Sequence, residues 1–182
     1  MKKIVFALLL IALLPSFFIA ADNFRSNEFL DTVADIEGHV YRTIKIGTQV
    51  WMIENLKTSK FNDGKDIIQA NKDNFWDSKP NFCWYDFDIK HKAKYGALYN
   101  GYAVITNKLC PAGWRVPTLD DWIILIKFLD PEFDPSSPIG MNSAAKKMKT
   151  VEYWEYGVES TNQSGFSAVP GGYRSYSGMG GI

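Results

Sequence analysis

The sequence contains few of the residues from which metal sites and catalytic thiol sites are built. It has only two histidines, His39 and His91, and only two cysteines, Cys83 and Cys110. A zinc site needs three or four His, Cys or carboxylate ligands at close spacing. Neither a His-x-x-x-His pair nor a Cys-x-x-Cys pair occurs in the chain. We therefore expect no zinc site and no cofactor.

Motifs of other catalytic classes and of nucleic-acid binding are missing as well. No glycine-rich phosphate loop precedes a predicted helix. The segment GFSAV at 165–169 lacks the second glycine of a hydrolase nucleophile elbow. Twenty basic residues balance twenty acidic ones, so we expect no basic surface for nucleic acid. These absences favour a protein that is not an enzyme and does not bind nucleic acid.

Acidic residues near one turn leave an alternative open for a metal. Asp130, Glu132 and Asp134 could supply oxygen ligands to a structural calcium ion, although they do not follow the EF-hand pattern. We favour the simpler interpretation, in which the three carboxylates are solvated loop groups.

The N-terminus carries the one long hydrophobic run. Lys2 and Lys3 precede an apolar stretch at 4–14, and Ala20–Ala21 lie at its far end. This is the order of a secretory signal peptide. We favour a cleaved signal over an uncleaved anchor, because Pro15 interrupts the run and a spanning helix needs roughly 20 apolar residues.

Removal of the signal peptide defines the predicted organisation of the chain. It takes away two lysines and leaves 18 basic and 20 acidic residues, a net charge of −2. No later segment is apolar enough to span a membrane. We predict an exported protein (secreted, periplasmic or cell-surface) with a signal peptide at 1–21, a polar leader at 22–34 and one domain at 35–182.

Both cysteines lie in the exported part of the chain. An even number of cysteines in an oxidising compartment predicts one disulfide, between Cys83 and Cys110. The alternative is a redox-active thiol pair, but such pairs commonly have Cys-x-x-Cys spacing. We favour the structural bridge.

The segment at 40–53 has the clearest local pattern. Residues 40–46 and 49–53 are rich in β-branched and aromatic side chains, and Gly47–Thr48 separates them. A two-residue loop with glycine first predicts a β-hairpin. We expect Glu54 and Asn55, at its end, to hold the chain by hydrogen bonds rather than to act in catalysis.

Two helices are predicted further along the chain. Thr118 and Asp121 have the spacing of a capping box at a helix start. Apolar residues then recur at i, i+3, i+4 and i+7 up to Leu129, which predicts one buried stripe. A second helix is predicted at 141–148. Between the hairpin and these helices, residues 57–94 show no period and are predicted to form long loops with short strands.

Aromatic residues are abundant, at 15% of the chain. Tryptophan and tyrosine combine flat apolar faces with polar edges and suit protein or sugar partners. We expect Trp51, Trp114 and Trp122 to pack in the core. Trp76, Trp84 and Tyr85 lie in irregular sequence, and we retain them as candidate ligand contacts beside the alternative that they pack internally.

Four segments resemble, in order and spacing, the Fibrobacter succinogenes major paralogous domain. They are DIEGHVYRTIKIGTQVWMIENL, YGALYNGYAV, LCPAGWRVPTLDDW and NQSGFSAVPGGYR. The motif residues with expected structural roles are Trp51, Glu54, Asn55, Trp114, Arg115, Pro117, Thr118, Asp121 and Trp122. Arg115 is expected to form a buried ion pair or hydrogen bonds to loop carbonyls. The resemblance covers residues 35–174 and implies an exported bacterial protein without an established activity.

The segment from Arg115 to Trp122 is also similar to one in formylglycine-generating sulfatase modifiers. This similarity implies an α+β, C-type-lectin-like fold with short antiparallel strands, about two helices and long irregular loops. It does not transfer function, because those enzymes use cysteines near their C-terminus and none follows Cys110 here. Such domains also continue past the PGGYR segment, so we expect a C-terminal truncation.

These observations predict an exported, surface-associated domain that binds a protein or glycan ligand or has a structural role, without catalysis. The alternative is an oxidoreductase-like relative of the formylglycine-generating enzymes, which would need a reactive thiol.

Overall fold

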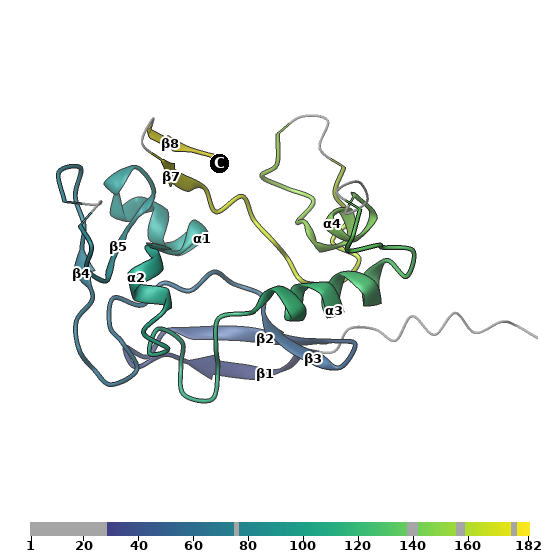
Figure 1. Cartoon of the computed structure of the whole chain (residues 1–182), viewed down its shortest axis with the longest axis horizontal. Helices are drawn as coiled ribbons and strands as arrows, with labels where there is room; N and C mark the ends of the chain where they lie inside the picture. The colour runs from purple at the N-terminus through teal and green to yellow at the C-terminus, as the bar shows by residue number, and fades with distance from the viewer. Residues whose placement is uncertain (1–28, 75–76, 138–141, 156–158, 176–177) are drawn as a thin grey trace, which may run out of the picture.

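The computed structural model describes residues 29–74, 77–137, 142–155, 159–175 and 178–182. The predicted signal peptide, the start of the predicted leader, Trp76 and Met141 lie outside these ranges. Within the described ranges, no helix is both long enough and apolar enough to cross a membrane. Figure 1 shows how the elements are arranged.

A three-stranded antiparallel sheet contains the predicted hairpin. Its strands are β1 (Phe29–Ala34), β2 (Val40–Ile46) and β3 (Gln49–Met52), in the order β1-β2-β3. The hairpin is confirmed, because Ile46 pairs with Gln49 across the two-residue loop. Gly47 has a φ of 61°, a conformation that glycine adopts without steric cost.

Strand β1 corrects the prediction that residues 22–34 form a polar leader. Residues 29–34 pair with β2, from Phe29 opposite Ile44 to Ala34 opposite Val40. The segment FLDTVA has no clear alternation of apolar and polar residues. It forms a strand because β2 offers it a hydrogen-bonding edge, a tertiary effect that overrides local preference.

Helices α3 (Leu119–Leu129) and α4 (Asn142–Met148) confirm the two predicted helices. Helix α3 lies over the sheet (Figure 1), and its predicted apolar stripe is buried. The buried side chains of this first core cluster are Ile44, Ile46, Ile53, Leu125, Ile126, Leu129 and Ala144. The hairpin turn also touches α3, because a Cβ atom on Gly47 would lie 2.9 Å from the ring of Phe128.

Short elements form the other side of the molecule, as predicted for 57–94. The strands are β4 (Ile68–Gln69), β5 (Asn81–Cys83) and β6 (Leu98–Tyr99), and the helical turns are η1 (Tyr85–Phe87), η2 (Ile89–His91), α1 (Lys92–Tyr95) and α2 (Gly101–Val104). Strand β5 pairs parallel with β4 and antiparallel with β6. The second core cluster, around β5, contains Phe61, Ile67, Phe82, Trp84 and Leu109.

The chain after α4 returns toward these short elements and ends in a hairpin of β7 (Tyr173–Ser175) and β8 (Gly178–Gly180) (Figure 1). The described fold is therefore mixed α/β, with small and mainly antiparallel sheets and few short helices.

The predicted disulfide is wrong, because Cys83 and Cys110 are both free thiols. Successive side chains of a strand point to opposite faces. On β5, Phe82 packs in the same cluster as Leu109, whereas Cys83 packs with Ala70 in a third cluster. Cys110 follows Leu109 in the chain, so it approaches the face of β5 from which Cys83 points away.

Candidate functional site

Segments from all four motifs meet at one cleft of about 760 Å³, which we call the motif cleft. The hairpin end contributes residues 49–52 and 54–56, and the second motif contributes residues 95, 97–99 and 104. The third motif contributes residues 109–110 and 113–117 with Asp121 and Trp122 of α3, and the fourth contributes Phe166 and the glycine pair at 171–172. These segments are far apart in sequence. Their meeting point is the strongest candidate site in the described part of the chain.

Asn55 joins three of these segments. Its side-chain Nδ2 donates to the backbone oxygen of Tyr95 at 3.0 Å. The neighbouring Leu56 oxygen accepts from the Ala97 amide at 2.9 Å. A Cβ atom on Gly171 would lie 3.1 Å from the same Asn55 nitrogen, so only a very small residue allows the fourth segment to approach this closely. The prediction that Asn55 holds the chain by hydrogen bonds is confirmed.

Glu54 also connects two segments by hydrogen bonds. Its carboxylate accepts from the backbone amide of Arg42 at 2.7 Å and from the Arg42 Nε at 2.6 Å. These contacts connect the end of β3 to β2. As predicted, the carboxylate has a hydrogen-bonding role at this position.

Three aromatic rings form one wall of the motif cleft. The centroid of Trp51 lies 4.9 Å from that of Trp122 and 5.6 Å from that of Phe166, and the latter two are 5.9 Å apart. All three are partly buried and pack against the first core cluster. Trp51 and Trp122 therefore pack against the core as expected, and their remaining surface also lines the cleft.

Trp114 is a further large ring of the cleft. It is half-buried and lines the cleft with Pro117, in the segment that leads into α3. Across the described residues, the indole N–H groups of Trp114 and Trp122 donate to no protein acceptor. The indole N–H of Trp51, by contrast, donates to Gln49 Oε1 at 3.3 Å.

The start of α3 forms the polar rim of the cleft. Thr118 and Asp121 make the predicted capping box, with Thr118 accepting from the Asp121 amide and Asp121 accepting from the Thr118 amide at 2.7 Å. Arg115 forms a two-pronged ion pair with the Asp121 carboxylate, with one contact at 2.7 Å. The predicted ion pair of Arg115 is present, but it is exposed rather than buried.

The charges of the motif cleft are paired with one another or with near neighbours. Glu54 pairs with Arg42, and Arg115 pairs with Asp121. The hydrogen bonds from Arg115 and Thr118 hold the pKa of Asp121 far below its usual value. No other charged side chain lines the cleft in the part of the chain that the structure describes. An uncharged ligand therefore meets no unpaired charge there.

The candidate ligand contacts from irregular sequence are placed differently. Trp84 is only 2% exposed and packs in the second core cluster, with its ring 5.0 Å from that of Phe82. This placement gives it a packing role. Tyr85 is half-buried and lines a second, separate pocket. Trp76 lies outside the described residues.

Sequence reasoning missed Tyr95, Tyr99 and Phe166 as cleft residues. Tyr99 donates its hydroxyl to the Thr58 backbone oxygen at 2.6 Å, and burial raises the pKa of that hydroxyl above its usual value. Each of the three lies within or beside a quoted family motif. Their place in the family motifs is the only feature of the sequence that indicates a role for them, because none of the three belongs to a periodic stretch.

A group of potential metal ligands occurs at the turn between β1 and β2. Asp35, Glu37 and His39 each place a ligand atom within 4.8 Å of the others. The Asp35 carboxylate, however, accepts from two backbone amides, from the Tyr41 hydroxyl at 2.6 Å and contacts the His39 ring. The alternative calcium ligands, Asp130, Glu132 and Asp134, do not form such a group among the described residues. Protein donors already occupy the Asp35 oxygens, which makes this turn a structural feature.

The fold and the cleft together define a mixed α/β domain whose sequence motifs surround one aromatic-walled cleft. A comparison with protein families matches residues 44–180 to the Fibrobacter succinogenes major domain. The chain belongs to this family, and the resemblance identified from the four segments is confirmed. Comparisons with curated proteins and with solved structures gave no match.

Proposed function

We propose that this protein is an exported, surface-associated, non-catalytic domain that binds an uncharged saccharide in the motif cleft. The observation that carries the proposal is the meeting of all four family motifs at one cleft with aromatic walls and internally paired charges. Sites for small ligands are typically concave and largely apolar, with a few polar groups that fix orientation.

The chemistry of the cleft favours a saccharide over other neutral ligands. A pyranose has apolar C–H faces that stack on aromatic rings and hydroxyl groups that accept hydrogen bonds. Trp51, Trp114 and Trp122 supply the rings. The indole N–H groups of Trp114 and Trp122 supply unused donors, and aromatic rings with a polar edge are well suited to such mixed contacts.

The C-type-lectin-like architecture is part of this proposal. Small antiparallel sheets, long loops between them and the helix that follows the GWRVPT segment support it. An experimental structure compared with C-type-lectin-like domains tests it. A different strand order around the equivalent helix would contradict it.

A glycan array probed with the purified exported protein tests the binding function. We expect selective binding to uncharged glycans and a loss of at least tenfold in the Trp114→Ala variant, because the indole is a central ring contact. Tyr102→Ala is the matched control, since Tyr102 is exposed and does not line the cleft. If the protein bound peptides but not glycans, and Trp114→Ala abolished that binding, the result would contradict the saccharide proposal and favour a protein ligand.

Export is tested by fractionation of a cell that expresses the full chain, with N-terminal sequencing of the product. We expect the protein outside the cytoplasm and a new N-terminus near Ala21. An intact N-terminus in the cytoplasmic fraction would contradict export.

The alternative function, an oxidoreductase-like activity, needs a reactive thiolate. Cys110 lines the motif cleft, but burial raises the pKa of its thiol. Burial also raises the pKa of Cys83 to about 11. Both thiols are then protonated at neutral pH and react slowly. Rapid alkylation of Cys110 by iodoacetamide at pH 7 would favour the enzyme and count against the non-catalytic proposal.

A further inference from the structure

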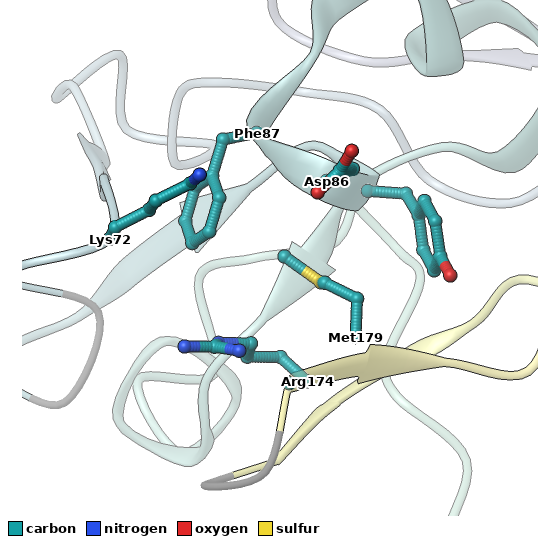
Figure 2. A pocket seen from close by; sticks show the side chains of 7 residues that line it. Lys72, Asp86, Phe87, Arg174 and Met179 are labelled. Atoms are coloured by element: carbon teal, nitrogen blue, oxygen red, sulfur yellow. The ribbon is translucent and has the colours of Figure 1, made fainter.

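A second pocket, of about 470 Å³, lies on the side of the molecule that carries the C-terminal hairpin. Figure 2 shows its side chains arriving from three parts of the chain. Lys72 comes from the loop after β4, Asp86 and Phe87 come from η1, and Arg174 and Met179 come from β7 and β8. None of these residues lines the motif cleft.

The charges of this pocket differ from those of the motif cleft. Two cations, Lys72 and Arg174, and one carboxylate, Asp86, line this pocket. Neither Lys72 nor Asp86 forms an ion pair with any described residue. In Figure 2, Lys72 and the guanidinium of Arg174 both lie to the left of Met179, whereas Asp86 lies above it. The cationic side is thus suited to an anionic group.

The rest of the pocket is apolar. Phe87 and Met179 line it, and both pack against the buried cluster of Ala70 and Cys83. The guanidinium of Arg174 lies over the Phe87 ring, with Cζ 5.8 Å from the ring centroid. This cation–π contact holds the guanidinium beside the pocket. A ligand here would place a charged group near the two cations and an apolar or ring-shaped body against Phe87 and Met179.

The backbone of the pocket wall is held in an uncommon conformation. Asp86 and Phe87 have φ values of 50° and 56°, in the left-handed region that non-glycine residues rarely adopt. Two turn hydrogen bonds fix this geometry, from the Phe87 amide to the Trp84 oxygen at 2.9 Å and from the Asp88 amide to the Tyr85 oxygen at 3.1 Å. Such strain is concentrated at ligand sites, where it positions side chains. Here it brings both Asp86 and Phe87 to the pocket.

We propose that this pocket is a binding site for a small monocarboxylate with a ring or apolar body. Arg174 and Lys72 bind the carboxylate, and the planar guanidinium favours a planar anion. Asp86 limits the site to a single negative charge, because it repels dianions such as phosphate at neutral pH. The site is independent of the saccharide proposal, since the ring of Tyr85 against Gly172 separates it from the motif cleft.

An NMR titration of the ¹⁵N-labelled protein with sodium benzoate tests the site. We expect saturable shifts at residues 72, 85–87, 174 and 178–179, no comparable shifts with benzyl alcohol, and weaker binding of inorganic phosphate. Absence of saturable shifts, equal shifts with benzyl alcohol, or phosphate binding as tight as benzoate would each overturn the proposal.

Two substitutions in the pocket should change the affinity for benzoate in opposite directions. Lys72→Ala should weaken benzoate binding about tenfold, the effect of one lost charge-assisted hydrogen bond. Asp86→Asn should strengthen binding of benzoate and of phosphate, and asparagine tolerates the left-handed conformation. Lys65→Ala is the control, because it removes an exposed loop lysine outside the pocket. Equal affinities in all three variants would contradict the assignment even if benzoate binds elsewhere.

Discussion

The two sides of this molecule are built in different ways. One side, the sheet–helix half, consists of β1–β3, α3 and α4, with strands of up to seven residues and a helix of eleven. The other, the loop half, consists of β4–β6, η1, η2, α1 and α2, with strands of two or three residues. Both have a buried cluster of large apolar side chains. Regular elements are thus not required for a core, and the motif cleft lies where the two halves meet.

The comparison predicts that the loop half depends most strongly on its few central side chains. Phe82 is 1% exposed, and its ring contacts those of Trp84 and Tyr99. Phe82→Ala should lower the free energy of unfolding by about 4 kcal/mol, because a large cavity opens among short elements. Urea denaturation followed by circular dichroism measures the change.

Ile105→Ala is the matched control for Phe82→Ala, since Ile105 is 71% exposed beside the same half. It should change stability by less than about 0.5 kcal/mol. Equal effects of the two substitutions would show that the second cluster is not a core.

In the sheet–helix half, Leu125 occupies the corresponding central position. It is fully buried on α3 and packs in the first core cluster. Leu125→Ala should destabilise the protein by about 3 kcal/mol. The neighbouring Ile124→Ala should cost much less, because Ile124 is 48% exposed and lies outside the first core cluster. A single unfolding transition in both core variants would show that the two halves unfold together. Two transitions in either variant would show that the halves unfold independently.

The two halves also differ in how much of them could be predicted from sequence. The hairpin at Gly47–Thr48 and the stripe ending at Leu129 follow from local periodicity and turn chemistry, and both are present. Strand β1 was missed because its partner β2 defines it, not its own pattern. In the loop half, only the general expectation of short strands and loops could be reached.

The same limit explains what was missed at the site and at the cysteines. An even cysteine count carries no information about which face of β5 Cys83 occupies, so the predicted bridge fails. Trp84 lies in irregular sequence but is buried by distant residues. The motif residues were recognised, but their meeting at one cleft depends on contacts such as that from Asn55 to Tyr95, 40 positions apart. Family motifs indicated which residues matter, and tertiary contacts decide what they form.

A smaller effect is expected at the boundary of the two halves, where the third motif enters α3. Thr118→Ala removes the hydroxyl that accepts from the Asp121 amide and should cost about 1 kcal/mol, the usual effect of a lost helix cap. Thr118→Ser, which keeps a hydroxyl, should remain close to the parent protein. Thermal denaturation compares the three proteins, and a Ser variant as unstable as the Ala variant would show that the methyl group, not the cap, matters.

The smallest expected effect concerns Glu37, which ties the turn between β1 and β2 to the start of the loop half. Its carboxylate accepts from the Thr58 hydroxyl at 2.9 Å and from the Ser59 hydroxyl at 2.7 Å. Burial raises the pKa of Glu37, but the hydrogen bonds from Ser59 and Thr58 outweigh it and lower the pKa from 4.5 to about 2. Because the folded-state value lies below the unfolded one, the contribution of Glu37 is complete above pH 4.5 and is lost as the pH falls toward 2.

Glu37→Gln should therefore reduce the loss of stability that acid causes in the parent protein. Urea denaturation at pH 7, 4.5 and 3 measures the free energy of unfolding of both proteins. We expect the parent to be more stable at pH 7 and the difference between the two proteins to narrow as the pH falls. Glu155→Gln is the matched control, because Glu155 is exposed and has no ion pair or hydrogen bond among the described residues. A difference in unfolding free energy that stays constant with pH would contradict this prediction. It would mean that neutral hydrogen bonds to Thr58 and Ser59 are sufficient to hold the two halves together and that the charge of Glu37 contributes nothing.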